Sequence, residues 1–178
     1  YFGAQPNYLH ELLAGWLHMT WGGIPAANTV ALGALLFSLL AFYLLFRHLA
    51  GSRVMGLLLS VLVASYSLFF DNQLLDLSLS NAGFLVLAVY FWLRTAETPH
   101  WKWAGATVAF ALLTGLGHLY YGAMLLGLFL LALPFAALGS FHGDGPRRRS
   151  LIYTVAIILA TVVLVILVLW GPLATIRG

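Results

Sequence analysis

Long apolar runs dominate the sequence, and one of them extends from residue 103 to residue 139 without any Asp, Glu, Lys or Arg. Apolar residues make up 62% of the 178-residue chain and charged residues 7%, whereas soluble domains average about 45–50% and about 25%. So few charges do not cover a water-soluble surface, and disordered chains are poor in apolar residues. A net charge of +3, with basic residues scattered between apolar runs, argues against a nucleic-acid partner. The sequence therefore predicts an all-α, polytopic membrane protein whose first partner is the lipid bilayer.

Charged and glycine-rich segments divide the chain into six runs near the length of about 20 apolar residues that a bilayer-crossing helix needs. The predicted spans are 24–46, 54–70, 74–93, 103–117, 119–139 and 151–172. The run 103–139 is divided in two because it is too long for one span and has glycines near its middle. The runs lack the alternating pattern of β-barrel strands. We therefore expect a transmembrane helical bundle over 24–172, an outer interfacial segment over 1–23 and an outer tail over 173–178.

The basic residues lie almost entirely on one side of this arrangement. Three connecting loops, 47–53, 94–102 and 140–150, contain seven of the eight Lys and Arg residues. The positive-inside rule makes that side cytoplasmic. The N-terminal segment, the 71–76 loop, the turn at 117–118 and the C-terminus are then expected on the outer side of the membrane.

Polar groups that suggest chemistry lie mainly on this outer side. Residues 7–21 have an amphipathic pattern, which predicts a helix in the outer interface. Glu11 and His18 of that helix form either its solvated face or one wall of a substrate groove. Asn72 and Asp76 are one helical turn apart, and Asp76 lies one turn inside the third apolar run, where ionisable groups are costly and generally functional. The alternative is that Asp76 caps a helix or forms a pair at the water boundary.

Two further polar groups have more than one interpretation. His118, followed by Tyr120, suits a substrate contact, a metal or pigment ligand, or a hydrogen-bonded loop histidine. Arg147, Arg148 and Arg149 follow a loop that contains glycine and proline. They predict a cytoplasmic loop near anionic headgroups, and a specific lipid-phosphate site is the sharper alternative.

Contacts between the spans are expected at small residues, because lipid is as apolar as leucine and burial of apolar surface does not drive helix association in a membrane. The candidate contact positions are Gly33, Ala34 and Ala41 in the first span, and Gly105 and Ala109 in the fourth.

The order of several local motifs gives the chain a family resemblance. The segment from Tyr1 to Pro6 precedes the amphipathic stretch, and the first span ends with Phe46 to Gly51. Leu75-Asp76 heads the third span, which closes with Tyr90 to Arg94, and the fourth begins at Trp103-Ala104-Gly105. Over roughly residues 1–140 this ordered set resembles the GT-C superfamily of polytopic membrane glycosyltransferases, close in layout to aminoarabinose lipid A transferases and protein O-mannosyltransferases.

The resemblance implies inverting sugar transfer on the outer face, from a polyprenyl-phosphate donor to an acceptor, in a bacterial inner membrane. In such enzymes the main catalytic acid lies in the first outer loop, which here would fall upstream of Tyr1, so we expect the chain to be a fragment. Asp76 occupies the place of a second acid, which contacts the acceptor or a divalent metal; no other cofactor is indicated. The groove-lining residues would be Glu11, His18, Asn72, His118 and Tyr120.

Two departures from the family pattern keep a second hypothesis open. Gln5 stands where the family often has Lys, and residues 115–118 fill a place that is often basic, with only His118 able to substitute. A degenerate relative without catalysis is the alternative, acting as a transmembrane subunit of a larger complex in contact with lipid, quinone or pigment. A transporter bundle with helices broken near 115–122 is the third hypothesis.

Overall fold

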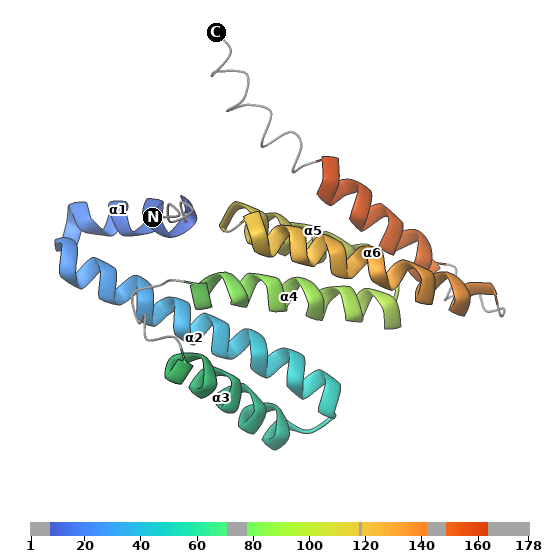
Figure 1. Cartoon of the computed structure of the whole chain (residues 1–178), viewed down its shortest axis with the longest axis horizontal. Helices are drawn as coiled ribbons and strands as arrows, with labels where there is room; N and C mark the ends of the chain where they lie inside the picture. The colour runs from blue at the N-terminus through green and yellow to red at the C-terminus, as the bar shows by residue number, and fades with distance from the viewer. Residues whose placement is uncertain (1–7, 71–77, 118, 142–148, 164–178) are drawn as a thin grey trace, which may run out of the picture.

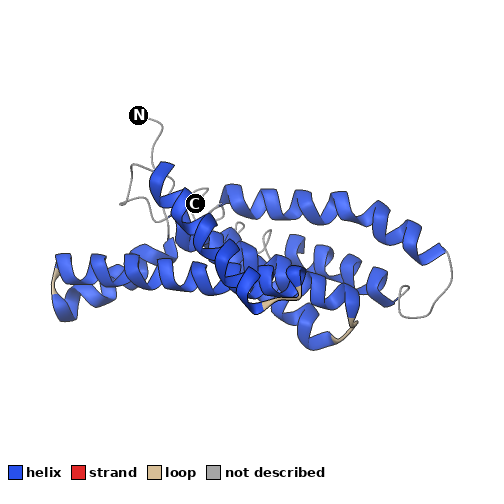
Figure 2. Cartoon of the chain, turned by 90° about the horizontal axis from the view of Figure 1, so that it is seen from below, coloured by secondary structure: helices blue, strands red, loops and turns tan. Residues whose placement is uncertain are grey.

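The structure, a computed structural model, describes residues 8–70, 78–117, 119–141 and 149–163 (Figure 1). The helices are α1 (Tyr8–Trp21), α2 (Gly23–Ala50), α3 (Arg53–Phe70), α4 (Ser78–Glu97), α5 (Trp101–Gly117) and α6 (Leu119–Phe141), followed by a helix at Arg149–Val163. Figure 2 shows helices and a few loop residues in these described segments, and no strand occurs among them. The predicted all-α class is confirmed.

Local sequence sets several of the helix ends. α2 ends before Gly51, whose φ of 64° is in the left-handed region that glycine adopts without strain. α3 begins two residues later, and the backbone N–H of Met55 donates to Ser52 Oγ at 3.4 Å, as at a helix N-cap. At the start of α5, the backbone N–H of Lys102 donates to Nδ1 of His100, the residue before the helix, at 3.1 Å. These side-chain acceptors satisfy amide groups that a helix start leaves without a partner.

The described helices correspond to the predicted apolar runs, four of them over the full run and two over part of it. α3, α5 and α6 cover the runs 54–70, 103–117 and 119–139, and α2 covers 24–46 and continues to Ala50. α4 begins at Ser78 and continues to Glu97, so the first residues of the run 74–93 lie outside the described segments. The last run, 151–172, is described as helix only as far as Val163. The amphipathic segment predicted at 7–21 corresponds to α1.

The helices α2 to α6 are arranged as neighbours that alternate in direction (Figure 1). α2 packs against α3 on one side and α4 on the other, and α4 also packs against α5 and α6. α3 therefore lies at the edge of the bundle and α4 near its centre. α1 lies at the end of the bundle where α2 begins, in contact with α2 and α5.

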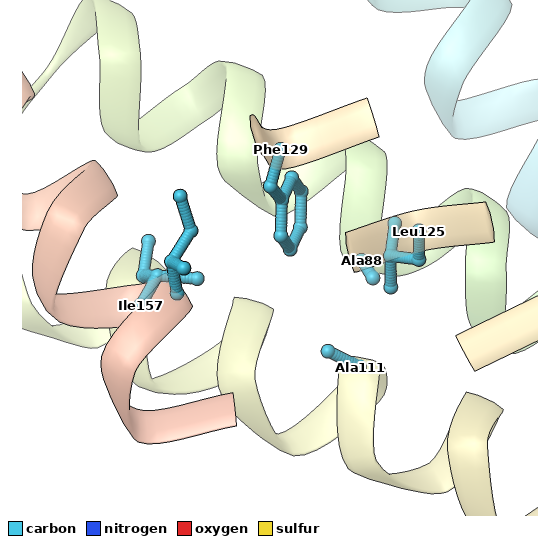
Figure 3. Close-up of a cluster of buried hydrophobic side chains, with 6 residues drawn as sticks. Ala88, Ala111, Leu125, Phe129 and Ile157 are labelled. Atoms are coloured by element: carbon cyan, nitrogen blue, oxygen red, sulfur yellow. The ribbon is translucent and has the colours of Figure 1, made fainter. Parts of the chain in front are cut away.

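The main apolar cluster lies among α4, α5, α6 and the Arg149–Val163 helix (Figure 3). Its buried members are Ala88, Ala111, Leu125, Phe129, Ile157 and Ile158. Phe129 is fully buried, with its ring centroid 5.3 Å from that of Trp92. Trp92 also donates its indole N–H to Thr154 Oγ1 at 3.4 Å. The alanines let the helices approach closely around this one large ring.

The outer surface of the bundle carries large apolar side chains. On α2, Leu32, Leu36 and Leu40 are each more than half exposed and recur every four residues, which places them on one helix face. The exposed apolar residues of α3 include Val54, Leu57, Leu58 and Leu62. Similar residues lie on α6 and on the Arg149–Val163 helix. Large leucine-rich faces of this kind are unusual for a soluble monomer.

The interior, in contrast, contains hydroxyl groups. The buried polar residues are Ser38, Ser60, Thr95, Thr107, Thr114, Thr154 and Thr161. Thr95, Thr107 and Thr114 each donate to the backbone carbonyl four residues earlier, at 2.7–2.9 Å. These three helix hydroxyls are thus satisfied within their own helices, whereas Thr161 Oγ1 is buried without a partner among the described residues. In soluble proteins Ser and Thr are mostly exposed and Leu is often buried, so buried hydroxyls beside many exposed leucines depart from that distribution.

By length and composition, α2 is the one described helix that is both long enough and apolar enough to cross a bilayer. Shorter apolar segments occur at Arg53–Val63, Tyr121–Pro134 and Arg149–Val163. The described residues therefore contain one helix that is long and apolar enough to cross a membrane. They do not confirm the six predicted spans.

Two of the small residues predicted to mediate helix contacts do not do so. A Cβ atom added at Gly33 or Gly105 would meet nothing within 4 Å, and both residues are exposed. The prediction for these two glycines is wrong because periodicity does not show which way a helix is rotated. Ala109 is exposed as well, whereas Ala41 is fully buried as predicted.

Other glycines form the close helix contacts. A Cβ atom at Gly56 of α3 would lie 2.8 Å from both the Cα and the N of Arg47 in α2. A Cβ atom at Gly83 of α4 would lie 2.7 Å from Cδ1 of Phe37, also in α2. At these positions the absent side chain is what lets α3 and α4 approach α2.

Candidate functional site

Much of the predicted outer site lies outside the described residues. Asn72, Asp76 and His118 are outside them, and so are Arg147 and Arg148 of the predicted lipid-phosphate site. The roles assigned to these five residues therefore remain predictions. Arg149, the third residue of the predicted lipid-phosphate site, is exposed at the start of the last described helix.

Glu11 and Tyr120 lie in α1 and α6, and the structure describes only their backbone. His18, in the last turn of α1, is exposed. Its ring lies over the start of α2, where a Cβ atom at Gly23 would be 3.2 Å from Cε1 and Nδ1. The backbone N–H of Gly22 donates to His18 O at 3.1 Å. His18 thus occupies the corner between α1 and α2.

The metal prediction has no further support. Within the described segments, no three His, Asp or Glu side chains are grouped so that they could hold a metal ion. Asp76, the residue predicted to hold a divalent metal, lies outside these segments, so the prediction stays as it was.

The structure does bring charged and aromatic side chains together at the opposite end of the bundle. There the C-terminal ends of α2 and α4 meet the starts of α3 and α5 (Figure 1). We call this region the basic end and define it by its charged residues, Arg47 and His48 of α2, Arg53 of α3, Arg94 and Glu97 of α4, and Lys102 of α5.

An ion pair at the basic end joins α2 to α4. His48 Nε2 lies 3.1 Å from Glu97 Oε1, with the histidine side chain 17% exposed and the glutamate 55% exposed. The His48 ring also meets Tyr90 edge to face, with 5.6 Å between centroids. The contact relates the orientation of the His48 ring to that of the Glu97 carboxylate, and it joins α2 to α4.

Arg94 has no comparable acidic partner. Its guanidinium carbon lies 5.3 Å from the ring centroid of Trp103 on α5, a cation–π distance. Trp103 in turn stacks on Phe91, with 5.8 Å between centroids. Arg94 Nε is buried and has no hydrogen-bond partner among the described residues. Trp103 therefore holds the guanidinium group in place, and no carboxylate among the described residues neutralises its charge.

Trp101 and Lys102, at the start of α5, also lie at the basic end. Lys102 Nζ lies 6.0 Å from the ring centroid of Trp101, which is 67% exposed. Exposed tryptophan beside lysine is typical of the boundary between membrane and water. The arrangement suits contact with lipid headgroups.

Sequence reasoning gave Arg94 only a topological role and assigned nothing to His48. The spacing of Arg94 and Glu97, three residues apart on one helix, would favour an ion pair between them. The structure instead pairs Glu97 with His48 from a helix far away in the sequence. No local signal reveals that choice, because it depends on how α2 and α4 pack.

No family model, no curated protein and no solved structure matches the chain.

Proposed function

We propose that the chain is a polytopic membrane bundle and forms part of a GT-C-like glycosyltransferase that moves a sugar from a polyprenyl-phosphate donor on the outer face. The observation that carries the membrane part is the distribution of side chains, with many large leucines exposed on the outside and several hydroxyls buried beside the apolar core. The sugar-transfer part is supported by the ordered resemblance over residues 1–140.

The exposed leucines and the buried hydroxyls support lipid as the solvent around the bundle. In a bilayer, exposed leucine costs nothing, and helices associate through small residues and internal hydrogen bonds. Thr95, Thr107 and Thr114 are satisfied within their own helices, as a medium without water requires. Gly56 and Gly83 supply the close contacts.

Helix dimensions are compatible with more than one crossing. The 18 residues of α3 give about 27 Å at about 1.5 Å per residue, and the 20 residues of α4 give about 30 Å. The hydrocarbon core is about 30 Å thick. We therefore propose that α3 to α6 and the Arg149–Val163 helix cross the membrane with α2, as six spans.

The concentration of positive charge supports an orientation. Among the side chains of the basic end, Glu97 is the single acid beside four Arg and Lys residues. By the positive-inside rule this end faces the cytoplasm. The opposite end, with α1 and His18, then faces outward, and the segment carrying Asn72 and Asp76 connects α3 to α4 on that side.

Sugar transfer at the outer end would use a carboxylate to orient or deprotonate the acceptor hydroxyl. We assign this role to Asp76, with a divalent metal as the other partner the carboxylate suits. Glu11, His18, His118 and Tyr120 are the proposed groove residues around it.

The test is transfer activity of the full-length protein in membranes supplied with polyprenyl-phosphate mannose and polyprenyl-phosphate aminoarabinose. Asp76→Asn should lower the rate about 100-fold or more, the range of acid–base catalysis. Asp71→Asn, which removes an acid from the same connection, is the matched control and should transfer at nearly the wild-type rate. An Asp76→Asn protein as active as wild type would refute the role.

A non-catalytic subunit is the second candidate. Gln5 in place of lysine and the absence of a basic residue other than histidine at 115–118 favour it, because both places would otherwise contact the donor phosphate. Under this hypothesis the wild-type protein transfers neither sugar, and mild-detergent extraction recovers it with another membrane protein in fixed ratio.

A further inference from the structure

The guanidinium group of Arg94 contains the one buried cationic nitrogen without a hydrogen-bond partner in the described part of the chain, Nε. Its interaction with another side chain is the cation–π contact with Trp103. A buried donor without a partner is unfavourable, and Arg94 as a whole is only half-buried. An acceptor from outside the chain would therefore meet the guanidinium group at its terminal nitrogens and balance a charge that no described carboxylate pairs with.

The neighbouring acid is not available to Arg94. Glu97 lies one turn further along α4, but its Oε1 atom is 3.1 Å from His48 Nε2. Tyr90 packs edge to face on the His48 ring, which helps to hold that ring against Glu97. The structure thus pairs the described carboxylate of the basic end with His48 and not with Arg94.

The surroundings of Arg94 indicate which acceptor fits. The guanidinium group lies over Trp103, whose ring stacks on Phe91. A guanidinium group presents a planar fork of donors that matches phosphate. Lys102 adds a second cation next to Trp103 in sequence. The exposed Trp101 marks the depth of lipid headgroups.

We propose that Arg94, supported by Trp103 and Lys102, binds the phosphate group of an anionic phospholipid in the cytoplasmic leaflet. This site uses other residues than the outer sugar-transfer site and than the predicted lipid-phosphate site at Arg147 to Arg149. It rests on the membrane part of the proposed function, because only a membrane-embedded bundle holds this end at headgroup depth. Anionic lipids in that leaflet attract basic groups near the membrane surface.

The experiment is thermal unfolding of the purified full-length protein in neutral detergent. The probes are dihexanoyl phosphatidylglycerol, dihexanoyl phosphatidylcholine and inorganic phosphate, each titrated separately. A ligand that binds the folded state raises the unfolding midpoint. We expect phosphatidylglycerol to raise the midpoint of the wild-type protein, and the other two probes to leave it nearly unchanged.

Three variants locate the effect. Arg94→Gln should need about tenfold more phosphatidylglycerol for half of the effect, as expected from losing one charge-assisted hydrogen bond. Arg94→Lys keeps the charge but loses the fork and the planar stacking, so its requirement should lie between those of wild type and Arg94→Gln; it also serves if Arg94→Gln does not fold. Arg53→Gln removes an exposed charge from the same end and should behave as wild type.

Several outcomes would overturn the proposal. Equal half-effect concentrations in wild type and Arg94→Lys would do so, and so would equal losses in Arg94→Gln and Arg53→Gln. A response to inorganic phosphate as large as that to phosphatidylglycerol would assign the site to free anions instead. Carbonate extraction separates this failure from failure of the proposed function: a protein that stays in the membrane pellet but shows no lipid preference is embedded without this site, whereas a released protein is not embedded.

Discussion

The outer face of α3 and the interior around α4 are both apolar, yet they differ in which side chains are covered. On α3, Val54 and Leu62 are more than 60% exposed, whereas Leu87 and Ala88 of α4 are at most 6% exposed. α3 packs against α2 at the edge of the bundle, and α4 lies between α2, α5 and α6. Position in the bundle, more than the apolarity of the helix, therefore decides which residues make protein contacts.

The two regions also differ in what their small residues do. Gly56 marks the line along which α3 meets α2, and the rest of the described α3 surface is largely exposed leucine and valine. Around α4, small residues such as Gly83 and Ala88 face neighbours while Phe129 fills the remaining space. Substitutions that truncate, enlarge or charge single side chains in the two regions should therefore have different effects.

The largest effect is expected from truncating the ring at the centre of the interior. Phe129→Ala should lower the free energy of unfolding by about 3–5 kcal/mol, because it removes packing contacts and leaves a cavity. Leu131→Ala on the same helix, where the side chain is 71% exposed, should change it by less than about 0.5 kcal/mol. Reversible unfolding in mixed micelles measures both, and equal losses would contradict the assignment of inside and outside.

A charge on the outer face of α3 tests whether that face meets lipid or water. Leu62→Lys should cost about 2.5–3.5 kcal/mol of membrane insertion, since position 62 lies near the middle of the helix. Val54→Lys, next to Arg53 at the basic end of the same helix, should cost little, because its amine reaches the headgroups. The inserted fraction in carbonate-washed membranes gives the difference. If both variants behave alike, α3 is not embedded as proposed.

A smaller effect is expected from filling the contact between α3 and α2. Gly56→Leu should destabilise the bundle by about 1–3 kcal/mol, because the new side chain would meet the Arg47 backbone. Gly33→Leu places the same side chain in open space on α2 and should leave the unfolding midpoint unchanged. Loss of stability in the Gly33 variant alone would reverse the assignment of contact positions.

Much of the fold could be predicted from the sequence, because it depends on composition and on local breaks. The low charge and the continuous apolar runs indicated helices, and the segments around Gly51 and His100 marked where they end. Helix rotation could not be predicted, since Gly33 and Gly83 lie in similarly apolar runs, yet Gly83 faces Phe37 of α2 and Gly33 faces open space.

The site could be predicted less well. Asp76, the central residue of the predicted outer site, lies outside the described segments, so its role rests on the resemblance. The pairing of His48 with Glu97, which leaves Arg94 without an acid, depends on contacts between distant parts of the chain. A charge pattern shows which end is basic, but it does not show that Glu97 pairs with His48 and not with Arg94.

The central claim is that the basic end and the α1 end lie on opposite sides of a membrane, and single-cysteine labelling tests it directly because the chain contains no cysteine. Thr20 of α1 and Thr98 after α4 are both exposed. With a membrane-impermeant maleimide, the Thr20→Cys protein should react in intact cells and the Thr98→Cys protein only after the membrane is opened. Reaction of both proteins in intact cells, or of both only after opening, would contradict the account.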